Sequence, residues 1–178
     1  MVIRPLTPAD AHSYMALRRE MLGDSPWAFS ASPHDDTVLN PALLTTRLAE
    51  PGQAIVGAYG HDPMSGALHL VGAAGLRRNH SSKMAHRAHI WGVYVTPSAR
   101  GRGIATQVMK AILALAGTWP GVNSVNLSGS VRSTAAHRLY ERMGFQQWGL
   151  EPGAIMLDGH AYDEIHMVAP ITGDGHPA

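Results

Sequence analysis

Apolar positions along the chain follow two spacings, and the spacing predicts which segments are helices and which are strands. Four segments have helical spacing and are predicted helices: 11–22, 39–48, 104–119 and 134–143. Alternating or continuous apolar runs predict strands at 2–6, 53–59, 67–77, 88–95, 122–131, 145–150 and 161–168. The predicted order is therefore one strand, two helices, three strands, a helix, a strand, a helix and two strands.

This order predicts a mixed α/β (α+β) fold. Strands joined through a helix run parallel and strands joined by a short turn run antiparallel, so we expect both pairings in one sheet. The length of 178 residues suits one domain, which we expect over residues 1–169, with a flexible C-terminal tail over 170–178. The segment 60–66 contains glycine and proline and is expected to be the turn of a hairpin.

Composition excludes several classes of protein. Apolar residues make up 45% of the chain and charged residues 15%, which is a globular balance. No apolar run approaches the roughly 20 residues of a membrane-spanning helix, and we expect no signal peptide. The absence of cysteine excludes a disulfide framework and a cysteine nucleophile. The formal net charge is +1, so we expect no nucleic-acid partner. From the composition as a whole we expect no membrane partner and a cytoplasmic location.

Histidine is frequent, but its spacing does not favour a metal site. The eleven histidines are scattered along the chain, and no His-Glu-x-x-His motif occurs. His86 and His89 are three residues apart on an expected strand, which places them on opposite faces. We therefore predict no metal cofactor.

A glycine-rich turn between a predicted strand and a predicted helix is the strongest chemical signal. Residues 93–105 read Val-Tyr-Val-Thr-Pro-Ser-Ala-Arg-Gly-Arg-Gly-Ile-Ala. A helix N-terminus has unpaired N–H groups, glycines let the backbone approach an anion, and Arg100 and Arg102 add charge. This combination predicts a pyrophosphate site, with a plain structural turn as the alternative. The dinucleotide fingerprint and the Walker A sequence both fail here.

Two motifs resemble those of the GNAT superfamily of acyl-CoA-dependent N-acetyltransferases. Residues 100–105, Arg-Gly-Arg-Gly-Ile-Ala, fit the family's pyrophosphate loop, Gln/Arg-x-x-Gly-x-Gly/Ala. Residues 133–145 are similar to its Asn-x-x-Ala-x-x-Leu-Tyr-x-x-x-Gly-Phe, with Ser133 in place of the usual Asn. The resemblance spans residues 2–168.

The resemblance implies a mostly antiparallel central sheet of six to seven strands. It implies helices on both faces and a sheet splayed between strands 4 and 5. The implied cofactor is acetyl-CoA, with the pantetheine arm beside the fourth strand and the pyrophosphate on the turn. The residues implied to bind it are Val93, Tyr94, Val95, Arg100, Gly101, Arg102, Gly103, Ile104, Ala105, Thr106, Ser133, Ala136 and Tyr140.

The resemblance also implies transfer of an acetyl group to a primary amine by direct attack. Tyr140 stands at the position of the family's general acid, and a phenol is protonated at neutral pH. His89 stands where many relatives have a glutamate base, and Glu20, Tyr94, Glu164 or water are alternatives to it. A CoA-binding module without catalysis is the alternative function.

The acceptor amine is expected to lie near a loop that contains two aromatic residues. Trp27 and Phe29 either line this pocket or plug the core from outside. The other expected boundaries are the turn 60–66 and the segment 150–160. Few carboxylates occur in these segments, so a peptide end, an amino acid or an apolar amine fits better than a polycation. A homodimer is a possible assembly.

Overall fold

The computed structural model describes residues 1–61 and 66–171. In this part of the chain one sheet has the strand order β1-β2-β3-β4-β5-β7-β6. Its strands are β1 (Val2–Pro5), β2 (Gln53–His61), β3 (Leu68–Arg78), β4 (Arg87–Val95), β5 (Ser124–Ser130), β6 (Gln146–Leu157) and β7 (His160–Pro170). The pair β4–β5 is parallel and every other neighbouring pair is antiparallel. The predicted mixed, mostly antiparallel sheet is confirmed.

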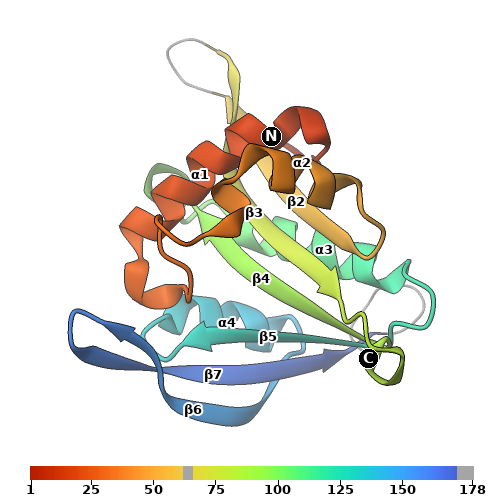
Figure 1. Cartoon of the computed structure of the whole chain (residues 1–178), viewed down its shortest axis with the longest axis vertical. Helices are drawn as coiled ribbons and strands as arrows, with labels where there is room; N and C mark the ends of the chain where they lie inside the picture. The colour runs from red at the N-terminus through yellow and green to blue at the C-terminus, as the bar shows by residue number, and fades with distance from the viewer. Residues whose placement is uncertain (62–65, 172–178) are drawn as a thin grey trace.

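Helices cover both faces of this sheet, as expected (Figure 1). The α-helices are α1 (Ala11–Asp24), α2 (Pro41–Ala49), α3 (Ile104–Gly117) and α4 (Thr134–Arg142). Successive side chains of a strand point to opposite faces, and β2 shows this directly. Ile55 packs in the core beneath α1 and α2, whereas Val56 packs in the core beneath α3 and α4. None of the described helices is long and apolar enough to cross a bilayer.

Strands β4 and β5 pair only over a short stretch and then separate. Three pairs join them, the last of which is His89 with Asn126. Beyond that point β4 runs on to Val95 and β5 runs on to Ser130, and the two diverge (Figure 1). The splay that the resemblance implies between strands 4 and 5 is therefore present.

A bulge in β4 lies beside this opening. The pair Tyr94–Ala73 is followed by the pair Trp91–Gly75, so β4 has one residue more than β3 in this interval. Gly92 in the bulge has a φ of +60°. Gly75 lies beneath the indole of Trp91, and a Cβ built at residue 75 would be 2.1 Å from Trp91 Cε2. The close approach of this ring therefore requires glycine on β3.

The C-terminal strands are longer than predicted. The expected segments 145–150 and 161–168 are 12- and 11-residue strands, and their turn contains Asp158 and Gly159, both with positive φ. Pro170 ends β7 in register with Ser124, and Ile171 is 7% exposed. Strand β7 and the buried residue after it thus extend beyond residue 169, the expected end of the domain. The remainder of the expected tail, 172–178, and the centre of the expected turn, 62–65, lie outside the described residues.

Candidate active site

A cavity of about 460 Å³ lies beside the glycine-rich turn, where the C-terminal half of β4 faces the starts of α3 and α4. We call it the turn cavity. All but two of the predicted cofactor residues line it; the exceptions are Arg102 and Thr106. The lining members are Val93, Tyr94, Val95, Arg100, Gly101, Gly103, Ile104, Ala105, Ser133, Ala136 and Tyr140. The fold therefore brings two distant sequence motifs to one cavity.

The turn presents backbone N–H groups without a competing side chain. Gly101 and Gly103 have φ of +76° and +74°, and no atom lies within 4 Å of a Cβ built at either residue. Gly103 is the N-cap of α3, and no side chain caps that helix. The first N–H groups of α3 remain available, and the helix dipole favours an anion there. This geometry fits a phosphate group.

The side chain of Arg100 lines the turn cavity and also bonds to neighbouring parts of the protein. Its Nε donates to the carbonyl of Val95 (2.9 Å), and its Nη2 pairs with Asp24 at the end of α1 (2.5 Å). Burial opposes ionisation of Asp24, but hydrogen bonds from Arg100 and Ser25 outweigh it and lower the pKa of the carboxyl. Arg100 thus links the turn to α1, and the backbone N–H groups of the turn are left open to an anion.

A second cavity, of about 270 Å³, lies in the splay between β4 and β5. We call it the cleft cavity. Charged and polar side chains from α1, β3, β4, β5 and β7 line it, among them Arg18, Arg77, His89, Ser128, Ser130 and Glu164, and the loop residues Ser30 and Ser133 line it as well. Phe29, Val93 and Tyr140 line both cavities, together with Ala28, Ser133 and Ala136. The two cavities therefore meet where the side chain of Tyr140 faces the middle of β4.

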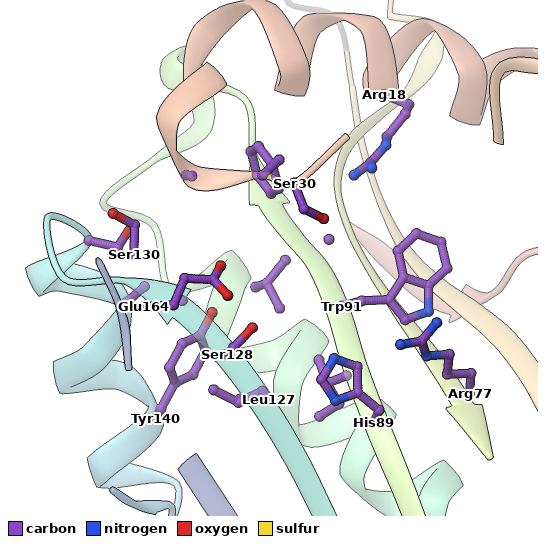
Figure 2. A pocket seen from close by; sticks show the side chains of 18 residues that line it. Arg18, Ser30, Arg77, His89, Trp91, Leu127, Ser128, Ser130, Tyr140 and Glu164 are labelled. Atoms are coloured by element: carbon purple, nitrogen blue, oxygen red, sulfur yellow. The ribbon is translucent and has the colours of Figure 1, made fainter. Parts of the chain in front are cut away.

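Tyr140 is buried at this junction. Its residue surface is 5% exposed, and desolvation raises the pKa of the phenol. The ring packs against Phe145, with 6.1 Å between centroids. In Figure 2 the hydroxyl points into the cleft cavity, on the side of Ser128 and Glu164. The protonated phenol of Tyr140 therefore lies at the boundary between the two cavities.

His89 lines the cleft cavity, and its environment disfavours its charged form. Desolvation and the charges of Arg77, His166 and Arg87 lower its pKa to about 4. Its imidazole is therefore neutral at pH 7, and the positive charges around it oppose the approach of an ammonium group. It also lies four residues before Val93 on β4, which is about 13 Å along an extended strand.

The other base candidates differ in position. Glu20 accepts hydrogen bonds from Tyr94 (3.3 Å) and Thr96 near the end of β4, and it does not line the cleft cavity. Glu164, on β7, does line it, and Figure 2 shows its carboxylate facing the interior near Ser128. Among the described residues that line this cavity, Glu164 is the one with a carboxylate group.

The two loop aromatics lie in different places, and only Phe29 lines the cleft cavity. Phe29 lines both cavities and also packs against the core beneath α1 and α2. Trp27 is half-buried, lines the turn cavity and stacks near Arg132, 5.3 Å from the ring centroid. The segment 150–160 is part of the β6–β7 hairpin and lines neither cavity.

Arg18 is a site residue that the sequence analysis missed. It lies on the buried face of α1, and its Nε pairs with Asp36 at 2.6 Å, with both side chains less than 10% exposed. Its guanidinium also lies near the rings of Phe29 and Trp91. The available signal was an arginine at an inward position of the helical repeat, where a charge needs a partner or a function.

Comparison with known proteins assigns this architecture to a family. The family model for the acetyltransferase (GNAT) family matches residues 15–145. A curated but uncharacterized protein of Mycobacterium leprae is 29% identical over 154 residues, which cover 85% of this chain and 36% of that protein. The chain spans 36% and 43% of the lengths of two curated relatives that it matches.

Solved structures share the fold at low sequence identity. A GNAT-family acetyltransferase from Streptococcus pneumoniae superimposes with a TM-score of 0.80 at 17% identity, covering 96% of this chain and 99% of that one. The acetyltransferase yncA from Salmonella typhimurium, solved with its cofactor acetyl-CoA, gives a TM-score of 0.78 at 18% identity and covers 97% and 94%. These likenesses show the fold.

Proposed function

This chain belongs to the GNAT family of acetyltransferases, and we propose that it transfers an acetyl group from acetyl-CoA to a primary amine by direct attack. The observation that carries the proposal is the meeting of the turn cavity and the cleft cavity at Tyr140. One cavity has an anion-binding turn and the other has a carboxylate, so a thioester and an amine would approach each other from opposite sides. The relative solved with acetyl-CoA supports this choice of donor.

The donor fits the turn cavity in two respects. The uncapped N-terminus of α3 and the open glycines suit the pyrophosphate. Past His89, the described part of β4 has no strand paired on its β5 side, so its main-chain groups can bind an extended arm. The carbonyl of Val95 is the exception because it accepts from Arg100.

Tyr140 is proposed as the general acid. Acetyl-CoA supplies an activated thioester. When the amine nitrogen bonds to its carbonyl carbon, the C–S bond breaks and the thiolate takes the phenolic proton. Burial keeps Tyr140 protonated, and its position at the junction places that proton beside both cavities.

Glu164 is proposed as the group that receives the proton of the amine, in place of His89. The carboxylate attracts an incoming ammonium group by charge, whereas His89 stands between arginines that repel one. A water molecule can relay the proton over any remaining gap. His89 is better explained as part of the wall that binds the remainder of the acceptor.

The test is release of free CoA from acetyl-CoA with a panel of amines, amino acids and peptides. We expect amine-dependent release that falls by about 10²-fold or more in Tyr140→Phe, with CoA affinity retained. Glu164→Gln should lower kcat more than His89→Gln does. Tight CoA binding without release for any amine would favour the non-catalytic module. The cytoplasmic location and the homodimer stay predictions.

A further inference from the structure

A third cavity, of about 420 Å³, continues from the cleft cavity past the start of β4. It shares Arg77 and His89 with the cleft cavity. We call it the basic cavity, because its polar lining is cationic or neutral: Arg77, Arg78, His80, Arg87, His89, Asn79 and Asn126. No carboxylate is among the described residues that line it.

Two of the three arginines of this cavity donate hydrogen bonds to neutral acceptors. Arg87 donates from Nη2 to Asn126 Oδ1 (2.9 Å), and Arg78 donates from Nε to the carbonyl of Ala85 (2.7 Å). Neither acceptor carries a charge, and Arg77 is exposed at the shared wall. None of these three arginines takes part in an ion pair within residues 1–61 and 66–171. The cavity therefore retains its positive charge.

A buried donor in this cavity lacks an acceptor. Asn126 is 9% exposed, and its Oδ1 accepts from Arg87, which leaves Nδ2 as the other end of the amide. Nδ2 has no hydrogen-bond partner in the described chain. Buried donors are normally paired, so this N–H group needs an oxygen atom from a water molecule or from a ligand. Because arginines surround it, an oxyanion would satisfy the donor and the positive charge together.

The lowered pKa of His89 also indicates that this cavity favours an anion. Desolvation and the charges of Arg77, His166 and Arg87 lower its pKa, so the surroundings disfavour a further cation. The same positive potential favours an anion. An oxyanion in this place meets two arginines and the Asn126 amide, which is a multiple charge-assisted contact.

The distance along β4 sets the size of the ligand. Val93, where the two reaction cavities meet, and His89, where the basic cavity begins, are four residues apart, about 13 Å in a strand. A free α-amino acid is too short to reach both. An extended peptide reaches that far with its fourth or fifth residue. We propose, resting on the proposed acetyl transfer, that the acceptor is a peptide-like amine whose carboxylate or phosphate group, roughly 13 Å from its nitrogen, binds the basic cavity.

The experiment uses C-terminally amidated peptides with an N-terminal alanine and a glycine background. One Asp is placed at each position from the second to the sixth, with Asn at the same position as the matched neutral peptide. The Asp/Asn ratio of kcat/KM should be tenfold or more at the fourth or fifth position and below twofold at the second. A phosphoserine peptide at the best position distinguishes a phosphate ligand from a carboxylate.

Variants connect that ratio to the cavity. Arg77→Gln and Arg87→Gln should each reduce the Asp/Asn ratio to below about threefold, because each removes one positive charge next to the anion. Arg19→Gln is the matched control, since Arg19 is exposed on α1 and lines none of the three cavities. It should leave the ratio unchanged. A uniform Asp/Asn ratio across all positions, with amine-dependent release intact, overturns this inference but not the proposed function.

A binding measurement decides the case in which no peptide is acetylated. With CoA saturating, inorganic phosphate should raise the unfolding midpoint of the wild type above that in chloride of equal ionic strength. Asn126→Asp keeps an oxygen for Arg87 and replaces the unpaired donor with a negative oxygen, so the increment should vanish. An equal increment in the wild type, Asn126→Asp and Arg77→Gln shows that phosphate binds elsewhere and refutes the site.

Discussion

Gly75→Ala tests whether the bulge of β4 shapes the reaction site. A Cβ at this residue would lie 2.1, 2.4 and 2.6 Å from three atoms of the Trp91 indole, so the ring must move. Trp91 lines the cleft cavity and packs near Arg18, with 5.8 Å between the guanidinium carbon and the ring centroid. The displaced ring therefore alters both the packing of α1 and the space for the acceptor.

The expected magnitude follows from overpacking. Inserting a methyl group into a filled site costs about 1–3 kcal/mol, and about 2 kcal/mol lowers the melting temperature of a domain of this size by roughly 4–8 °C. Misplacing the acceptor by about 1 Å lowers kcat/KM for the amine by up to about 10²-fold. Affinity for CoA should change little, because Trp91 does not line the turn cavity.

Thermal unfolding, CoA titration and amine-dependent CoA release together measure these effects. Gly23→Ala is the matched control, since a Cβ there has no atom within 4 Å and the residue lies in α1. Combining Gly75→Ala with Trp91→Phe should recover part of the lost stability, because the smaller ring leaves room for the methyl group. Equal melting temperatures for Gly75→Ala and Gly23→Ala would refute the packing argument.

Three further perturbations have defined outcomes. Asp10→Asn should cost about 1–2 kcal/mol in urea unfolding, because Arg4 and Tyr59 lose their charged partner; the lowered pKa of Asp10 means that this stability is present above about pH 4 and is lost as the pH falls further. In the wild type, the free energy of unfolding should fall between about pH 6.5 and 4, because the folded pKa of His89, about 4, lies below its unfolded value. His89→Gln should reduce this fall. An unchanged slope would show that this histidine is not desolvated. Gly103→Ala should cost about 1 kcal/mol through its left-handed backbone alone and weaken CoA binding in titration calorimetry; equal affinity would remove the turn from the donor site.

The fold was largely predictable because its signals are local. Helical spacing located α1, α3 and α4 to within a few residues, and the Gly101–Gly103 turn marked the start of α3. The long β6–β7 hairpin was underestimated because residues 151–154 break the apolar alternation with Glu, Pro and Gly. Its pairing depends on partners across the sheet instead of on its own pattern.

The candidate site was only partly predictable, because it depends on pairs that are distant in sequence. The two motifs located the turn cavity and Tyr140. His89 was chosen for its position in a motif, and nothing in the sequence indicates that Arg77 and Arg87 depress its pKa. The position of Glu164 in the cleft cavity depends on the pairing of β7 with β5, and this pairing is a property of the whole sheet.

The distribution of charge along the chain is uneven, and one segment without carboxylates contributes to both the glycine-rich turn and the basic cavity. A net charge of +1 suggests no electrostatic preference, yet no Asp or Glu occurs between residues 63 and 140, where nine of the fourteen Lys and Arg residues lie. This segment forms the glycine-rich turn and contains all of the described residues that line the basic cavity. Among the described residues that line the three cavities, Glu164 from β7 is the one carboxylate, and Asp24 from α1 is paired with Arg100 at the turn. In the proposed function, one continuous stretch of chain supplies both anion-binding regions, and Glu164 is the negative charge between them that receives the amine.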